Sequence, residues 1–426
     1  MKGNWAIKKL ESLVIKKGEY GINAASCEYS PNLYTYLRIT DISEDGRFIK
    51  EGKKSVDHPE SEKFVLEEGD IVFARTGAST GKTYLYNKSD GVLVFAGFLI
   101  RFKPNSDLLD SLFLKYVTQT SYYKNWVSIY SARTGQPGIN GNEYGKFSFK
   151  LPPLPQQKKI AKILSTCDAV IEKTEAAIAK YQDIKQGMMH DLFTRGIDLT
   201  TGKLRPTSEE APELYKDSEL GKIPKDWEVD ILCNALKPGK NITYGIVQPG
   251  EYVSSGVYMI RSQDYTKGWN GIETIMQVHP SIDKPYERSR VYSGDLLITV
   301  VGANVGRMEI VPESLNKANI SRSVSRISIN PEYANNKFCF YYLKSQMGKI
   351  LFSNQVGGAQ PVINLKSLEK FNFKLPNNRK EQLEIAKRIN SIENKIQGEI
   401  KTLNKSIEIK SGLMQDLLTG KVEVNV

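Results

Sequence analysis

The sequence predicts an α+β protein made of two mixed α/β domains, related by a pseudo-twofold axis and separated by two long helices that form an antiparallel coiled coil. Three observations support this prediction. A heptad pattern of apolar residues persists for about five heptads in the middle of the chain. The same pattern returns 225 residues later, which indicates a duplicated domain-plus-helix unit. The segment before each pattern holds short β-branched and aromatic runs separated by Gly, Asp and Asn.

The first long helix is predicted within residues 155–195, where apolar or semi-apolar positions alternate in steps of four and three. Glu, Lys, Gln and Ala fill the remaining positions and favour a helix. A long amphipathic helix lying on a globular core remains an alternative to a coiled-coil arm that needs a partner strand. The seam residues are Ile160, Leu164, Cys167, Ile171, Thr174, Ile178, Tyr181, Lys185, Met188 and Leu192, of which Thr174 and Lys185 suit a seam poorly.

The partner strand is predicted in the same chain. Adding 225 to each seam position gives a second seam without a slip, and the odd lysine is repeated as Lys410. The closing motif MHDLFT at 189–194 returns as MQDLLT at 414–419. The second helix must run back antiparallel to the first if the two seams are to bury each other. Its apolar seam residues are Ile385, Ile389, Ile392, Ile396, Leu403, Leu413 and Leu417.

Breaks in composition set the predicted boundaries. The segment LPPLP at 151–155 stops both strand and helix, Gly196 is a typical helix stop, and the polar segment after it is a surface connector. The prediction is a first domain at 1–153, a first helix at 154–196, a connector at 197–224, a second domain at 225–377, a second helix at 378–420 and a tail at 421–426.

Within the first domain, β-branched and aromatic runs predict strands, and a longer apolar run at helical spacing predicts a helix. The strands are expected at 14–15, 36–39, 71–74 and from 92 through Gly97 toward 100, and the helix at 108–127.

Composition narrows the class of protein. The formal net charge is +11 with a pI near 9.1, which favours a polyanionic partner. No apolar run is long enough for a membrane span, and the first residues do not resemble a secretory signal. The four cysteines are isolated, which fits reduced thiols and a cytoplasmic location.

One repeated segment resembles a phosphate-binding loop. Residues 69–82 align with 294–307, but only three residues separate Gly77 and Gly81, and the second copy lacks the lysine and hydroxyl. A tight turn that ends a strand explains the glycines equally well. The functional alternative is a loop that closes backbone amides and a cation on a DNA phosphate, with hydroxyl and amide side chains near base edges. Its candidate residues are Arg75, Thr76, Ser79, Thr80, Lys82, Asn304 and Arg307.

Further DNA-contact candidates lie outside this segment. Arg133 and Gln136 occupy a glycine-containing loop before the last strand of the first domain, and Gln360 repeats Gln136. Arginine can pair with guanine and glutamine with adenine through two hydrogen bonds each, although a plain turn is the alternative. Arg38 and Arg261 belong to another aligned pair of segments. Arg322 and Arg326 either flank a DNA surface or solvate the face of a strand.

Catalysis finds little support in the sequence. The three histidines show no metal-ligand spacing, and no nucleophile elbow is present. The glycine-rich cofactor motif and the Asn-Pro-Pro-aromatic motif of adenine methyltransferases are also missing. We therefore expect a chain without catalytic or metal-binding residues of its own.

Taken together, the order of elements resembles the specificity subunit of type I restriction–modification systems over essentially the whole chain. The resemblance rests on the LPPLPQQKKIAKIL helix ending in MMHDLFTRGI, the connector TTGKLRP…LYKDSELGKIPKDWEV, and the second helix ending in LMQDLLTGKV. It departs at the second helix entry, where LPNNRKEQ lacks the proline pair.

The resemblance implies that each domain is a target recognition domain for half of a bipartite, asymmetric site on double-stranded DNA. It also implies two modification (methyltransferase) subunits docked on the helices, and restriction subunits outside them. S-adenosylmethionine, ATP and Mg would then be bound by the partner subunits, with no cofactor on this chain. The first seam spans 33 residues (192 − 160 + 1), roughly 50 Å, so helix length would act as a ruler for the unread spacer.

Three alternatives remain at the level of the sequence. A fused methyltransferase or nuclease would need cofactor or metal motifs that are missing. A coiled-coil scaffold that binds only proteins would leave the basic charge and the divergent loops unexplained. A related restriction system, with cleavage and methylation on one partner chain, would use the same kind of specificity subunit.

Overall fold

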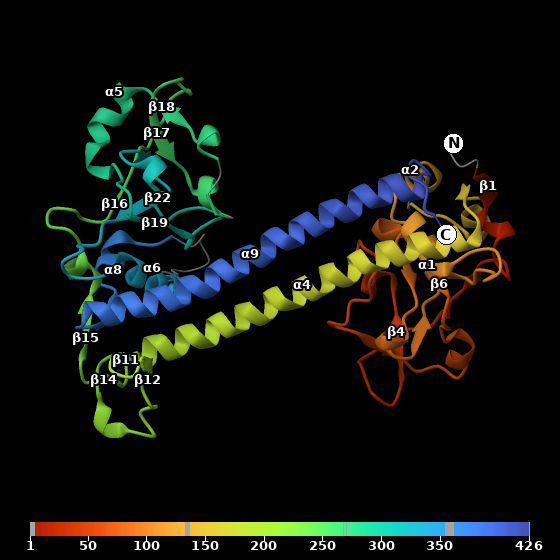
Figure 1. Cartoon of the computed structure of the whole chain (residues 1–426), viewed down its shortest axis with the longest axis horizontal. Helices are drawn as coiled ribbons and strands as arrows, with labels where there is room; N and C mark the ends of the chain where they lie inside the picture. The colour runs from red at the N-terminus through yellow and green to blue at the C-terminus, as the bar shows by residue number, and fades with distance from the viewer. Residues whose placement is uncertain (1–4, 133–136, 267, 270, 354–361, 426) are drawn as a thin grey trace. The chain divides into compact units, whose positions relative to one another are not determined.

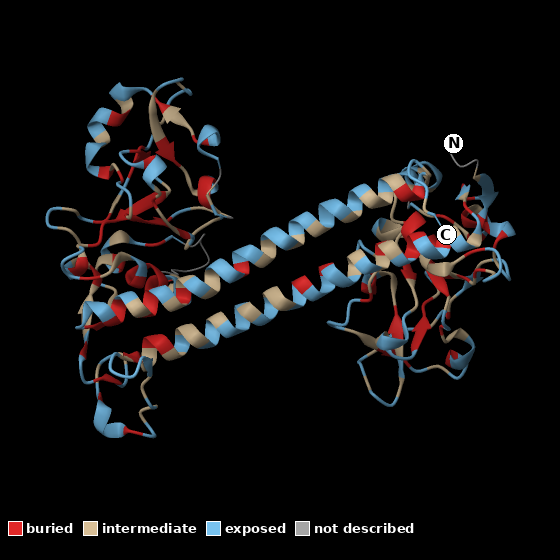
Figure 2. Cartoon of the chain, viewed as in Figure 1, coloured by how far each residue is buried: buried red, intermediate tan, exposed pale blue. Residues whose placement is uncertain are grey.

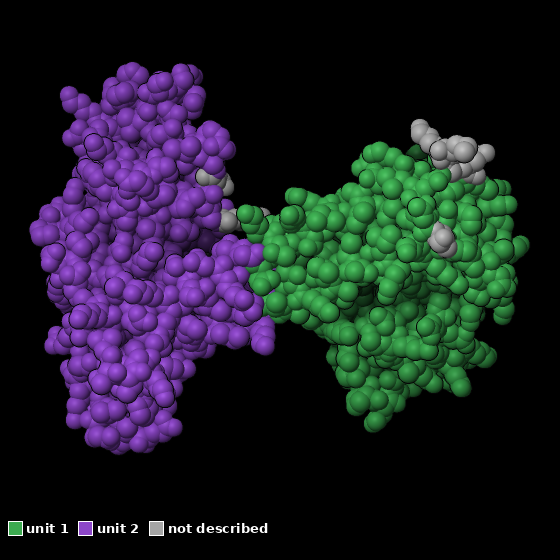
Figure 3. Space-filling view, viewed as in Figure 1, with its two compact units in different colours: residues 1–177, 399–426 green, residues 178–398 purple. Residues whose placement is uncertain are grey.

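The computed structural model describes residues 5–132, 137–266, 268, 269, 271–353 and 362–425 (Figure 1). The chain divides into two compact units, shown in Figure 3: unit 1 is residues 1–177 with 399–426, and unit 2 is residues 178–398. Each unit therefore combines one globular domain with part of both long helices.

Unit 1 is built on two four-stranded sheets. The first has the order β2 (Glu19–Tyr20), β9 (Leu99–Phe102), β6 (Ile71–Ala74), β7 (Thr83–Leu85), with antiparallel pairs. The second has the order β3 (Ser26–Cys27), β5 (Lys54–Val56), β4 (Tyr34–Leu37), β8 (Leu93–Phe95), and β4 pairs with β8 in parallel. Strand β1 (Ala6–Lys9) pairs with β10 (Ser148–Leu151), and the helices before the long one are α1 (Ser111–Val117), α2 (Ser121–Ser131) and α3 (Gly141–Gly145).

Strand β6 is the centre of this domain. All four of its residues are buried, because helices cover one face and the second sheet covers the other. Ile71 and Phe73 pack into the cluster with α1, α2 and the start of the long helix α4. Val72 and Ala74 point the other way, into the cluster with β4 and β8. The apolar run at 71–74 is thus a strand buried on both faces.

Unit 2 repeats this architecture. Its first sheet has the same order, β16 (Thr243–Tyr244), β22 (Val324–Ile327), β19 (Leu296–Thr299), β20 (Met308–Ile310). The pairing of Leu296 with Ile327 matches that of Ile71 with Phe102, a shift of 225 in each strand (296 − 71 and 327 − 102). The remaining elements are β18 (Gln277–Val278), β17 (Val257–Ile260), β21 (Asn319–Ile320), the pair β15 (Trp227–Ile231) and β23 (Asn372–Pro376), and helices α5 (Pro280–Asp283), α6 (Asn336–Ser345), α7 (Met347–Ser353) and α8 (Leu365–Glu369).

Several predicted elements differ in the structure, each for a local reason. Residues 14–15 form only a single bridge, from Val14 to Pro104. The strand expected at 36–39 ends at Leu37, because the Arg38 and Asp41 side chains close a short 3-10 turn. The predicted helix at 108–127 is two helices, with Thr120 capping the second through its side chain. The expected run from 92 to 100 turns at residues 97–98 between β8 and β9.

The long helices are α4 (Leu154–Thr194) and α9 (Arg379–Leu418). In unit 1 the first part of α4 packs with the last part of α9, where Ile160 and Leu164 share a cluster with Leu413 and Leu417. In unit 2 Leu192, near the end of α4, shares a cluster with Ile385 and Ile389 of α9. The predicted antiparallel pairing is confirmed. All twenty seam positions are buried or half-buried, and Figure 2 shows such positions recurring along both helices between exposed ones.

The two lysines that suited the seam poorly each pair with a carboxylate on the opposite helix. In unit 1 Lys410 Nζ lies 2.6 Å from Asp168 Oδ1, and in unit 2 Lys185 pairs with Glu393. The two pairs are equivalent in the duplication: Lys410 lies 225 residues after Lys185, and Glu393 lies 225 residues after Asp168 (410 − 185 and 393 − 168). The seam lysines are thus satisfied by a duplicated ion pair.

A buried glutamine anchors each long helix to its domain. Gln157 Nε2 donates to the carbonyl of Pro152 (2.9 Å), and its Oε1 accepts from Asp110 N at 2.9 Å, the N-cap of α1. Gln382, the same position shifted by 225, donates to Pro376 O and accepts from Asn335 N at the start of α6. Each glutamine satisfies backbone groups that would otherwise be buried without partners.

The connector is fixed to the start of α9 by Glu381, which is almost fully buried. Arg205 donates to both of its oxygens (2.5 and 3.0 Å), and Ile197 N and Trp227 Nε1 donate to Oε1 as well. The connector itself forms two small hairpins, β11 (Ile197–Asp198) with β12 (Lys203–Leu204) and β13 (Tyr215–Lys216) with β14 (Ile223–Pro224). A bidentate pair with two further donors is a strong site for a buried carboxylate. No helix in the described part of the chain is long and apolar enough to cross a membrane.

Candidate nucleic-acid interface

The repeated glycine segment forms a hairpin loop in both units. In unit 1 it joins β6 to β7, and in unit 2 it joins β19 to β20, so a strand and not a helix follows it. A phosphate-binding loop needs a helix at that point. The loop is therefore a strand-to-strand turn.

The two loops have the same backbone hydrogen bonds. Gly81 N donates to Ala74 O at 3.0 Å, and Gly306 N donates to Thr299 O at 2.9 Å. Gly77 and Gly302 have φ of 68° and 99°, and Gly81 and Gly306 have φ of 89° and 84°, values that favour glycine. The glycines are therefore required by the turn, and the N–H groups of Gly81 and Gly306 are already hydrogen-bonded within it.

The side chains on the loops differ between the two units. Lys82 Nζ lies 2.8 Å from Glu44 Oε1, whereas Arg307 is exposed and pairs with no carboxylate among the described residues. Thr80 donates back to Gly77 O at 2.8 Å, and Ser79 and Asn304 are half-buried. Of these candidates, Arg307 is the one with the most accessible charge.

Arg75 and Thr76 follow β6 directly. The Arg75 guanidinium lies over the Tyr20 ring, 4.9 Å from its centroid, and the Tyr20 hydroxyl accepts from Gly141 N at 3.1 Å. Thr76 forms an antiparallel bridge with Gly138, next to the segment that carries Arg133 and Gln136. Arg133, Gln136 and Gln360 lie outside the described residues.

Arg38 and Arg261 make equivalent ion pairs in the two units. Each guanidinium binds an aspartate three residues later: Arg38 Nη2 to Asp41 Oδ1 at 2.6 Å, and Arg261 Nη2 to Asp264 Oδ1 at 3.1 Å. Both aspartates are nearly fully buried and also cap a 3-10 turn. Hydrogen bonding to Asp41 raises the pKa of Arg38 against the opposing effect of burial. Each of these arginines therefore stabilises a 3-10 turn in its unit.

Arg322 and Arg326 do not share one environment. Arg322 is exposed in the turn before β22. Arg326 is almost fully buried in β22, where its guanidinium donates to the carbonyls of Arg288 (2.6 Å) and Arg290 (2.9 Å). Burial lowers the pKa of Arg326. The interpretation of Arg326 as a surface or DNA-flanking residue is wrong, because its side chain is almost fully buried and its guanidinium is bound to backbone carbonyls of the segment before β19.

A groove of about 1190 Å³ lies in unit 2 beside the end of α4. Its apolar side chains include Met189, Phe193 and Phe371. Its charged side chains are Lys349, Lys370, Lys374, Glu219 and Lys185, the last of which pairs with Glu393. Burial and the neighbouring Lys349 lower the pKa of Lys374. The sequence pattern did not predict this groove, although Lys349, Lys370 and Lys374 repeat Lys124, Lys146 and Lys150 of the first domain.

Tyr20 and Phe98 are also side chains that pattern reasoning missed. Both are exposed, by 40% and 56%, and both lie next to Arg75. No sequence signal links them, since 55 residues separate Tyr20 from Arg75 (75 − 20). Within the described residues, no group of three His, Cys, Asp or Glu side chains could hold a metal ion.

A duplicated α/β domain, joined to paired heptad helices and presenting different cations on the same framework, is the architecture of a DNA-recognition subunit. The chain belongs to the family described as type I restriction modification DNA specificity domain, whose sequence model matches residues 2–180 and 247–410. It is a type I restriction–modification specificity subunit with two such domains.

Relatives and solved structures agree with this assignment. The chain is 31% identical over 375 residues to the putative type I restriction enzyme MjaX specificity subunit of Methanocaldococcus jannaschii, covering 85% of this chain and 80% of the relative. It is 26% identical over 405 residues to the MjaVIII specificity subunit of the same organism, covering 92% and 86%. The Escherichia coli EcoBI specificity subunit is 32% identical over 273 residues, covering 63% and 56%. The solved S subunit from M. genitalium matches with a TM-score of 0.61 at 16% identity, covering 97% of this chain and 96% of that one, a likeness of fold alone.

Proposed function

We propose that each of the two domains reads one half of a bipartite, asymmetric site on double-stranded DNA. The observation that supports this is a four-stranded sheet repeated in the same strand order whose loop cations differ, with Lys82 paired to Glu44 in one loop and Arg307 exposed in the other. Two domains with one scaffold and unlike surfaces suit two unlike half-sites. Half-buried Arg38, Lys82 and Arg261 each pair with a carboxylate. The other described candidate contacts that are exposed or half-buried are Arg75, Thr76, Ser79, Thr80, Asn304, Arg307 and Arg322.

The chain acts through partners. Two modification subunits dock on the paired helices and the groove beside them, and restriction subunits join the full complex. S-adenosylmethionine, ATP and Mg are bound by those partners. The match to a family of specificity subunits supports this composition, and so do the apolar side chains and the lysines that line the groove, which suit an acidic protein surface.

The test is to co-express the chain with its modification subunit and map modified adenines across a genome. The expected result is a single bipartite motif with a fixed unread spacer. A continuous motif, or no sequence-specific modification by an intact complex, would contradict the proposal. Binding to a duplex with that motif should also weaken steeply with added salt, because phosphate contacts release counterions.

The same assay tests whether helix length sets the spacer. Inserting one heptad near Thr174 in α4 and near Glu399 in α9 keeps both seams in phase and lengthens each helix by ~10.5 Å. At ~3.4 Å per base pair, the spacer should grow by about three base pairs while both half-sites stay the same. A seven-residue insertion after Gly221, in the exposed β13–β14 loop, is the control and should leave the spacer unchanged. An unmoved spacer in the paired-insertion variant would rule the ruler out.

A further inference from the structure

One corner of unit 1 places an arginine beside an exposed aromatic side chain. Arg75 follows β6, and Phe98 lies in the turn that leads into β9. Arg75 N donates to Phe98 O at 3.0 Å, which extends the pairing of Ala74 with Leu99 by one residue. Directly opposite residues of an antiparallel pair present their side chains on the same face. The two side chains therefore form one composite surface.

The Arg75 guanidinium is held in place without being neutralised. The Tyr20 ring covers its flat face at 4.9 Å, and Gly141 N fixes the Tyr20 hydroxyl from behind. A ring on the face of a guanidinium leaves the N–H edge free, and that edge carries the paired donors that match a two-acceptor partner. Among the described residues, no carboxylate forms an ion pair with Arg75.

Unit 2 keeps the framework of this corner and changes its side chains. Val300 N donates to Ser323 O at 2.8 Å, and Ile363 N donates to Val300 O at 2.9 Å, as Ile139 N donates to Arg75 O in unit 1. The positions of Arg75 and Phe98 are thus occupied by Val300 and Ser323.

The cation of unit 2 comes from the other strand. Arg322 stands where unit 1 has Gly97, and both amides make the same kind of bond, to Ile246 O at 2.9 Å and to Ile22 O at 2.8 Å. Arg322 is exposed. Each unit therefore presents one arginine at the same corner, from strand positions that are not equivalent.

We infer that Arg75 and Arg322 are the guanine-reading residues of the two half-sites, and that Phe98 receives the methyl group of a neighbouring thymine in the first half-site. The inference rests on the proposed function. Guanine offers O6 and N7 to the edge of a guanidinium in the major groove, and an apolar side chain discriminates thymine by its methyl group. Ser323 in place of Phe98 and the shifted arginine give unit 2 a different preference on the same framework.

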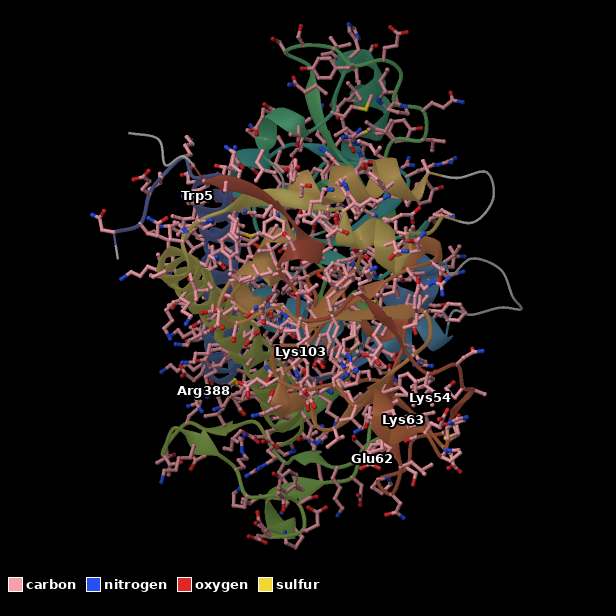
Figure 4. All side chains as sticks on the ribbon, turned by 90° about the vertical axis from the view of Figure 1, so that its right-hand side faces the viewer. Trp5, Lys54, Glu62, Lys63, Lys103 and Arg388 are labelled. Carbon is pink, nitrogen blue, oxygen red and sulfur yellow. The ribbon has the colours of Figure 1, made fainter. Side chains whose placement is uncertain are left out.

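The experiment maps modified motifs for complexes that carry Arg75→Ala, Arg75→Lys, Arg322→Ala or Phe98→Ser. Arg75→Ala should relax one guanine position in one half-site by about 5- to 150-fold in discrimination, and Arg322→Ala should relax one in the other half-site. Arg75→Lys keeps the charge and the fold but loses the forked geometry, so it should relax the same position. Phe98→Ser should relax an adjacent thymine. Lys103→Ala removes an exposed cation of the same unit that pairs with Glu67, and should change no position (Figure 4).

Each remaining outcome overturns the inference. If Arg75→Ala weakens binding equally on all sequences and lowers the salt slope by ~1, the side chain contacts a phosphate and not a base. If base discrimination is unchanged in the variants, or if a half-site contains no guanine, the inference is also wrong. The proposed function is not affected by either result. A wild-type complex that modifies no bipartite motif overturns the proposed function and this inference together.

Discussion

The ion pair between Asp168 and Lys410 is predicted to lock the two long helices together in unit 1. Both side chains are only about one-sixth exposed, 15% and 16%, so solvent screens them little. Asp168 also accepts the Tyr116 hydroxyl at 2.7 Å and lies 3.7 Å from Lys115 Nζ. The perturbations are Lys410→Met, Asp168→Asn and the double variant.

The expected magnitudes follow from which charges each change leaves behind. Lys410→Met leaves Asp168 with Tyr116 and Lys115, so it should cost about 1.5–3 kcal/mol, the value of a hydrogen bond to a charged group. Asp168→Asn leaves two lysines without a carboxylate and should cost about 3–5 kcal/mol, as removal of one partner of a buried pair does. The double variant should cost less than the sum, with a coupling energy of ~0.5–3 kcal/mol.

The pH dependence has a defined sign. Burial disfavours the Asp168 charge, but hydrogen bonds from Lys410 and Tyr116 outweigh it and lower the pKa of this carboxyl. A lowered folded-state pKa stabilises the fold fully above the unfolded value, ~3.9, and the contribution is lost as pH falls toward the folded pKa. The wild type should therefore lose stability in unit 1 below about pH 4 by an amount that Asp168→Asn lacks.

The assay is amide hydrogen exchange of the intact chain, read separately for residues 154–177 and 178–194 of α4. Protection in the first segment should fall about tenfold for each 1.4 kcal/mol, while the second segment, held by Lys185 and Glu393, should change little. Lys63→Met breaks an exposed pair with Glu60 and is the control (Figure 4). Equal exchange in all variants, or additive costs in the double variant, would refute the reasoning.

Other predictions concern single positions. Glu381→Gln should destabilise unit 2 by about 3–5 kcal/mol, because it leaves Arg205 buried beside a neutral amide. The measurement is limited proteolysis, in which the connector should be cleaved earlier than in the wild type. Gln156→Ala, at the equivalent position in unit 1, is the control. Gln382→Ala should cost about 1–3 kcal/mol for each backbone partner left unpaired, Asn335 N and Pro376 O, measured by urea unfolding. Arg307→Ala should lower the salt slope of DNA binding by ~1 with the motif unchanged if the side chain binds a phosphate, measured by titration at several salt concentrations.

The sequence predicted the elements whose signal is periodic. The helices were visible because a heptad seam is a one-dimensional pattern, and the 225-residue offset revealed the duplication before any contact was known. Even the two poor seam residues have local explanations in the structure. Thr174 donates to Val170 O within its own helix, and Lys185 finds Glu393. Neither partner could be assigned from spacing alone, because several carboxylates lie within reach on a predicted helix.

The candidate site was harder to predict because its contacts join distant segments. Arg326 and Arg322 look alike in the segment NISRSVSRISI, yet one is buried and the other exposed, because Arg326 lies within β22 and Arg322 lies in the turn before it. Arg38 and Arg261 were candidate DNA contacts, and their pairing with Asp41 and Asp264 could not be predicted, because a carboxylate three residues away need not fold back on an arginine. Tyr20 became part of the site only when the fold brought it against Arg75.

The two copies divide their surfaces into a repeated part and a divergent part. Lys124, Lys146 and Lys150 return in the second copy as Lys349, Lys370 and Lys374, which line the groove beside the end of α4, although surface positions are the freest to drift. At the ends of β6 and β19 the backbone bonds coincide but the side chains do not. A surface that meets the same partner twice is expected to stay the same in both copies, whereas surfaces that meet two different DNA sequences are expected to differ. We therefore predict that the repeated lysines face a protein partner, so the charge-reversing change Lys349→Glu should weaken binding of the modification subunit without altering the motif.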